Sequence, residues 1–198
     1  TFDADTSIET KVKRALEIGT EHLDHQVGYV TRIEDGTQEI VAAVGSNDSI
    51  EAGQRDPLER TYCRKTVEQD DPFVIGDAKS EGWDDDPAFE HFGLRRYIGA
   101  EIRIDGSTFG TLCFGGEEPG NRTLLDIQQL TVKTLASWVG YEIERHRYEQ
   151  TLERKTERLE KFAGVISHDL RNPLNVAQAR LELARETGDD EHFQPVAR

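Results

Sequence analysis

Hydrophobic residues change their spacing twice along the chain, which predicts helices at both ends and strands between them. Residues 7–24 carry apolar side chains at helical intervals, and Thr6 and Glu9 form a capping box at their start. The next two runs, at 27–33 and 39–44, are rich in β-forming residues. We expect these two runs to form a hairpin.

Turn and cap signals divide the middle of the chain. Asp-Gly pairs at 35–36 and 105–106 predict two hairpin turns. Asp56 precedes a proline and is expected to cap a second helix that carries Cys63, and Asp86-Pro87 is expected to cap a brief third one. Further strands are predicted at 73–75, 98–104 and 108–114, the second of them half-buried because apolar and polar residues alternate. Together these elements predict an α+β domain with a largely antiparallel sheet.

A long helical pattern follows from residue 123 to about residue 163 or beyond, with no proline before Pro173. Large apolar residues occupy alternating a and d positions of a heptad repeat, although Arg145 and Lys155 fall on the same seam. The seam residues are Trp138, Tyr141, Tyr148, Leu152, Leu159, Phe162 and Ile166. The pattern predicts a parallel dimeric signalling helix of modest stability. A single solvated helix rich in charge is the alternative.

An excess of acidic residues limits the partners of the chain. The 198 residues include 24 Lys and Arg against 39 Asp and Glu, a formal net charge of −15. Nucleic acid and anionic membranes repel such a surface, so we expect neither as a partner. The acidity, with more Arg than Lys, indicates adaptation to a salt-loaded cytoplasm of the haloarchaeal type, and an ordinary acidic protein is the alternative. No apolar run approaches the roughly 20 residues of a membrane span and no leader opens the chain, so a cytoplasmic location is expected.

One polar stretch within the helical pattern carries the candidate chemistry. Apolar residues around it form a single stripe on a helical wheel, made of Phe162, Ile166, Leu170, Leu174, Ala177 and Leu181. His168 falls almost opposite this stripe, beside Arg171 and Asn172, so we expect it to point outward. An exposed imidazole is largely neutral near pH 7, and its free nitrogen is a competent nucleophile toward a phosphoryl group. An ordinary exposed histidine is the alternative.

The order of residues from 166 to 175, Ile-Ser-His-Asp-Leu-Arg-Asn-Pro-Leu-Asn, resembles the phosphoacceptor box of sensor histidine kinases. The resemblance implies that His168 accepts the phosphoryl group, that Asp169 holds the other ring nitrogen, and that Asn172 positions water for dephosphorylation. It also implies a homodimer through the long helix, ATP and Mg²⁺ as cofactors of the parent kinase, and the receiver domain of a response regulator as partner. No nucleotide-binding motif is present in the sequence, so this segment is expected to be inactive alone.

Segments distributed over residues 7–145 resemble a GAF domain. They are Pro57-Leu58, Tyr62-Cys63-Arg64, 72–78, 97–102 and 110–114. The resemblance implies a sensor domain with a small-molecule pocket, which Cys63, Trp83, Phe89, His91, Phe92 and Tyr97 could line, although such aromatic residues are first of all core. Members of the family bind cyclic nucleotides, bilins or haem, or nothing known, so the ligand stays open.

We therefore expect a GAF-like sensor domain at 1–145, a signalling helix at 123–165 that overlaps it, and an incomplete phosphoacceptor domain at 160–198 with a turn at 188–190. The function expected is control of the phosphorylation of a histidine by a small ligand or by a redox or light signal. Two alternatives remain open: a small-molecule or thiol-redox domain without kinase activity, as in GAF-like sulfoxide reductases, and a purely structural dimerisation module. Cys63 and Cys113 are too few for a metal cluster, so no metal site is expected.

Overall fold

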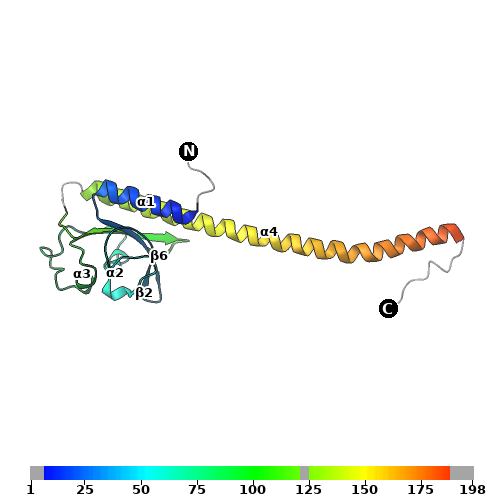
Figure 1. Cartoon of the computed structure of the whole chain (residues 1–198), viewed down its shortest axis with the longest axis horizontal. Coiled ribbons are helices and arrows are strands. Elements are labelled where there is room, and N and C mark those ends of the chain that lie inside the picture. Colours follow the sequence, from blue (N-terminus) through cyan, green and yellow to red (C-terminus); the bar gives the residue numbers. More distant parts are fainter. Residues whose placement is uncertain (1–6, 121–124, 188–198) are drawn as a thin grey trace. The chain divides into compact units, whose positions relative to one another are not determined.

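The computed structural model describes residues 7–120 and 125–187 of the chain. Two compact units meet between Arg147 and Tyr148, and the long helix α4 begins in the first unit and continues into the second (Figure 1). In chain order the elements are α1 (Ile8–Leu23), β1 (Val27–Glu34), β2 (Thr37–Gly45), β3 (Arg55–Pro57), η1 (Leu58–Arg60), α2 (Cys63–Thr66), β4 (Phe73–Ile75), α3 (Pro87–Phe92), β5 (Arg96–Ile104), β6 (Ser107–Gly116) and α4 (Leu125–Thr187).

The strands of the first unit form one six-stranded antiparallel sheet in the order β3-β2-β1-β6-β5-β4. Asp35 and Gly36 join β1 to β2 with φ angles of 49° and 72°, and Asp105 and Gly106 join β5 to β6 with 51° and 75°. Positive φ at both central residues is what a tight type I′ hairpin turn requires. Both predicted hairpins, and the predicted antiparallel sheet with flanking helices, are confirmed.

Helix α1 and the first part of α4 cover one face of the sheet (Figure 1). Their buried side chains pack with Phe114 and its neighbours on the sheet, and they are Val12, Leu16 and Leu23 of α1 with Val132, Ala136 and Val139 of α4. A Cβ atom at Gly19 of α1 would lie 2.2 Å from Cζ of Phe114. The missing side chain therefore lets α1 lie directly on the central strands.

A second core fills the other face of the sheet, beneath α2 and α3. Its aromatic side chains contact one another, with ring centroids 5.0 Å apart for Tyr62 and Tyr97 and 6.1 Å apart for Tyr62 and Trp83. Helix α3 begins where Asp86 accepts a hydrogen bond from the backbone N–H of Ala88 at 2.9 Å, as predicted.

Three local predictions differ from the structure. The side chain that caps α1 belongs to Ser7, and Thr6 lies outside the described residues. Asp56 caps no helix, because it lies in β3 and its carboxylate contacts His91 instead. The predicted half-buried strand β5 is covered on both faces over Tyr97 to Ala100, since cores lie on both sides of it there, and alternates only beyond them.

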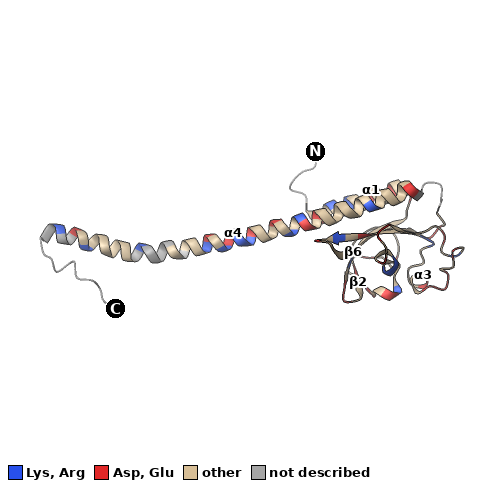
Figure 2. Ribbon diagram, turned by 180° about the vertical axis from the view of Figure 1, so that it is seen from behind, with Lys and Arg blue, Asp and Glu red and all other residues tan. Residues whose placement is uncertain are grey.

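Helix α4 confirms the predicted long helix and extends 63 residues to Thr187, passing through Pro173. The turn expected at 188–190 and the helix expected after it lie outside the described residues. Charged residues of both signs are spaced along α4 (Figure 2). Within the described parts of the chain, no helix is long and apolar enough to cross a membrane.

Candidate functional site

The predicted phosphoacceptor stretch lies within α4, where residues 166–175 are helical. The side chains of His168, Asp169 and Asn172 fall outside the described part of the structure, so their roles and the outward direction of His168 stay predictions. The five described members of the apolar stripe around them are exposed: Phe162, Ile166, Leu174, Ala177 and Leu181. In a single chain this stripe is therefore not covered.

The predicted heptad seam divides into two parts. Trp138 is half-buried and packs against the core under α1, which removes it from the seam. From Tyr148 onward the seam side chains are largely exposed, with exposed fractions of 72% for Tyr148, 56% for Leu152, 68% for Leu159 and 65% for Phe162. Hydrophobic side chains at this spacing are what a partner helix would cover.

The start of α4 is fixed to the first unit by charge and by close packing. Glu142 pairs with Lys11 of α1 at 3.1 Å and with Arg145 at 2.9 Å, and its side chain is only 11% exposed. Burial raises the pKa of Glu142, but the hydrogen bonds from Arg145 and Lys11 outweigh burial and lower that pKa below its ordinary value. Farther along, the guanidinium of Arg147 lies 5.3 Å from the ring centroid of Phe109 on β6. Helix α4 is thus held on the sheet up to the boundary between the units.

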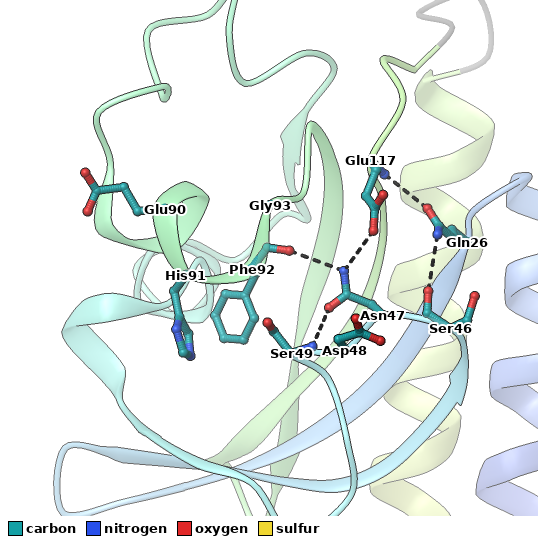
Figure 3. A pocket seen from close by; sticks show the side chains of 10 residues that line it. All are labelled: Gln26, Ser46, Asn47, Asp48, Ser49, Glu90, His91, Phe92, Gly93 and Glu117. Atoms are coloured by element: carbon teal, nitrogen blue, oxygen red, sulfur yellow. Dashed lines mark hydrogen bonds between the residues drawn. The ribbon is translucent and has the colours of Figure 1, made fainter.

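A polar cavity of about 410 Å³ opens at one end of the sheet (Figure 3). Asn47, in the loop after β2, donates hydrogen bonds to the carbonyl of Phe92 at 3.3 Å and to Glu117 at 3.4 Å. Gln26, before β1, donates to the carbonyl of Ser46 at 3.2 Å and accepts from the N–H of Glu117 at 3.3 Å. These bonds hold together segments from four parts of the chain.

The lining of this cavity is acidic. The cavity has ten lining residues in the described part of the chain. They include Asp48, Glu90 and Glu117, and none of them is Lys or Arg. A lining that holds carboxylates and, among its described residues, no Lys or Arg disfavours an anionic ligand and favours a cationic or neutral polar one.

Of the six side chains predicted to line a pocket, His91 and Phe92 line this cavity. The other four, Cys63, Trp83, Phe89 and Tyr97, belong to or pack against the core under α2 and α3. His91 also contacts the carboxylate of Asp56 at 2.8 Å. Sequence reasoning missed Gln26, Asn47 and Glu117, because loop polarity alone does not indicate which loops meet.

A buried polar cluster lies beneath α2. The hydroxyl of Tyr97 is 2.7 Å from that of Thr66 and 3.0 Å from Sγ of Cys113. Burial raises the pKa of Tyr97 well above its ordinary value, so this phenol stays protonated and acts as a hydrogen-bond donor. Among the described residues, no group of three or more His, Cys, Asp and Glu side chains is placed to hold a metal ion.

Two protein families match the chain, in the order in which the sequence resemblances place them. The model of the GAF domain family matches residues 5–140, and the model of the His Kinase A (phospho-acceptor) domain, HisKA, matches residues 158–197. The resemblances inferred from sequence are therefore confirmed at the level of the two families. No curated protein matches the chain.

Solved structures resemble the first part of the chain in fold. The GAF domain of an Acinetobacter phosphoenolpyruvate-protein phosphotransferase has a TM-score of 0.60 at 11% identity, over 75% of this chain and 89% of that one. The GAF domain of Thermosynechococcus elongatus PixJ, in its blue-light-absorbing form, has 0.59 at 20%, over 74% and 91%. A domain of a putative two-component sensor histidine kinase from Sinorhizobium meliloti has 0.57 at 17%, over 75% and 99%.

Proposed function

Because this chain belongs to the GAF domain family and a HisKA phosphoacceptor segment follows its GAF domain, we propose that it is the sensory and phosphoacceptor segment of a two-component histidine kinase. In this proposal the GAF domain responds to a small ligand or to a redox or light signal. The response controls autophosphorylation of His168, and the phosphoryl group then passes to the receiver domain of a response regulator.

The observation that carries the proposal is that one helix serves both domains. Helix α4 supplies Val132, Ala136 and Val139 to the core of the GAF domain, and the same helix contains residues 166–175. A change in the GAF domain that alters how α4 packs is therefore transmitted along a single element. The contacts of Glu142 and Arg147 with the first unit are the points at which such a change would act.

The proposed chemistry needs a nucleotide from another domain of the parent protein. ATP and Mg²⁺ would supply the phosphoryl group, and the neutral imidazole of His168 would attack it. Asp169 would hold the second ring nitrogen, and Asn172 would position the water that removes the phosphoryl group. The match of the HisKA family to residues 158–197 supports the proposal of these roles.

The GAF cavity supports a proposal about the ligand as well. Its three carboxylates, with no Lys or Arg among the described lining residues, favour a cationic or neutral polar molecule over an anionic one. An acidic metabolite or a phosphate ester would have to enter against these charges.

Labelling of the parent kinase with radioactive ATP tests the proposal. We expect acid-labile phosphate on the wild-type protein and none on the variant His168→Gln. The matched control is His146→Gln, which changes another histidine of the same helix and should leave labelling unchanged. Phosphate retained in His168→Gln would overturn the assignment of the phosphoacceptor.

We also propose that the kinase is a homodimer through α4. The exposed seam from Tyr148 to Phe162 supports this proposal, because two copies of the seam would cover each other's apolar side chains.

A further inference from the structure

The two cysteines of the chain lie together in the folded GAF domain. Cys63 is the first residue of α2 and Cys113 lies in the central strand β6, 50 residues later, yet their Sγ atoms are 3.7 Å apart. Both are free thiols, and both side chains are fully buried. The sulfur atoms of a disulfide lie about 2.05 Å apart, so a movement of about 1.7 Å would join them.

Hydrogen bonds around the two sulfur atoms give the two thiols different acidities. The thiol of Cys113 donates to Oγ1 of Thr111 at 3.1 Å, and the hydroxyl of Thr111 donates to Sγ of Cys63 at 3.1 Å. Burial raises the pKa of Cys63, but its hydrogen-bond contacts, chiefly those with Cys113, Thr111 and Tyr97, outweigh burial and lower that pKa. Burial raises the pKa of Cys113 well above its ordinary value. The thiolate is the reactive form of cysteine, and a hydroxyl that donates to Cys63 stabilises the thiolate there, so Cys63 is assigned as the nucleophile of the pair.

We propose that Cys63 and Cys113 form a reversible disulfide when the protein meets a hydroperoxide, which makes this pair a redox-sensitive modification site. The thiolate of Cys63 attacks the peroxide, the O–O bond breaks, and a sulfenic acid and an alcohol form after one proton is taken up. The sulfur of Cys113 then attacks the sulfenic sulfur, its proton passes to the departing hydroxide, and water leaves as the S–S bond forms. In total, two thiols lose two electrons and two protons, and one hydroperoxide becomes one alcohol and one water. A low-molecular-weight thiol reverses the change.

The position of the pair gives the disulfide a structural effect. Helix α2 has only four residues, and the bond would tie its first residue to the middle of the sheet. Because neither sulfur is exposed, a peroxide reaches Cys63 only when α2 opens locally, so opening would limit the rate of oxidation. The inference gives a site to the redox signal of the proposed function, and because the disulfide does not depend on His168, either can fail without the other.

Intact-mass measurement of the full chain tests the proposal. The native protein is treated with hydrogen peroxide, the peroxide is removed with catalase, and the chain is unfolded in guanidinium chloride with N-ethylmaleimide. We expect the oxidised chain to take no maleimide and to have lost two hydrogen atoms, and to take two maleimides after reduction with dithiothreitol. Since the sequence holds two cysteines, a disulfide within one chain can only join Cys63 to Cys113.

The variant Cys113→Ser and non-reducing electrophoresis distinguish a disulfide within one chain from other products of oxidation. In Cys113→Ser the reaction should stop at the sulfenic acid of Cys63, which dimedone traps. Non-reducing electrophoresis should show the oxidised wild type as a monomer. Two outcomes would overturn the proposal. One is the addition of two maleimides to the native protein after treatment with a peroxide concentration that oxidises the unfolded chain. The other is a disulfide that forms only between chains. The wild-type measurement decides even if the variant does not fold.

Discussion

The dimer seam of α4 offers the sharpest test, through the substitution Leu159→Glu. Leu159 lies on the predicted seam between Leu152 and Phe162, and in the single chain its exposed fraction is 68%. A second copy of α4 would cover this side chain in both chains at once. Glutamate would place two carboxylates against each other in the same apolar contact, where charge is costly.

The size of the effect follows from the exposed fraction. Complete burial of a leucine side chain contributes roughly 1.5–3 kcal/mol. Because 68% of Leu159 is left to cover, a partner would gain roughly 1–2 kcal/mol from each chain, and so roughly 2–4 kcal/mol for the dimer. At about 1.4 kcal/mol for each factor of ten, Leu159→Glu should weaken dimerisation roughly 30- to 1,000-fold, before the cost of the charges is added.

Sedimentation equilibrium of the full chain over a range of concentrations measures the dissociation constant. The control is Lys161→Glu, which changes the net charge by more than Leu159→Glu does but lies at an outward c position of the heptad. We expect Lys161→Glu to stay close to wild type. Equal dissociation constants for wild type and Leu159→Glu would refute the seam as the dimer contact.

Two further predictions concern the stability of the GAF domain. Burial lowers the pKa of His25 to about 4, against 6.5 in the unfolded chain, so below pH 6.5 the unfolded state binds the proton first. His25 should therefore contribute a loss of about 3 kcal/mol in the free energy of unfolding between pH 7 and pH 4. Urea titrations at both pH values should show this loss to be smaller in His25→Gln, and an identical loss in both proteins would contradict the argument. Gly19→Ala should lower the free energy of unfolding by up to about 2 kcal/mol. Overpacking against the buried ring of Phe114 costs about 1–3 kcal/mol, and the gain in helix propensity offsets about 1 kcal/mol of that cost. Gly164→Ala, with open space around it, is the control that should not destabilise, and a more stable Gly19→Ala would show that the ring can move.

Local signals in the sequence predicted the elements that local interactions determine. The Asp-Gly turns at 35–36 and 105–106 were predicted correctly because only a few residue types adopt positive φ at both positions. Helix α4 was predicted because its pattern repeats over many turns. Asp56-Pro57 was assigned wrongly, since aspartate followed by proline also suits an edge strand, and its actual partner, His91, lies 35 residues away.

The candidate sites depended on contacts between distant segments. Cys63 and Cys113 each fit the pattern of a core residue, and nothing in the sequence near either indicates that their sulfur atoms lie 3.7 Å apart. The cavity brings Gln26, Asn47 and Glu117 together from segments separated by strands, and hydrophobic spacing carries no information about such a meeting. The stretch from 166 to 175 could be recognised because its chemistry lies in consecutive residues of one helix.

The sheet ends on both sides in very short strands, β3 and β4, with three residues each. A strand from another molecule that joined β3 or β4 would find only three residues to pair with, and Pro57 in β3 has no N–H to offer. Growth of the sheet from one molecule into the next is therefore discouraged at both margins. Such short outermost strands disfavour edge-to-edge aggregation of the GAF domain.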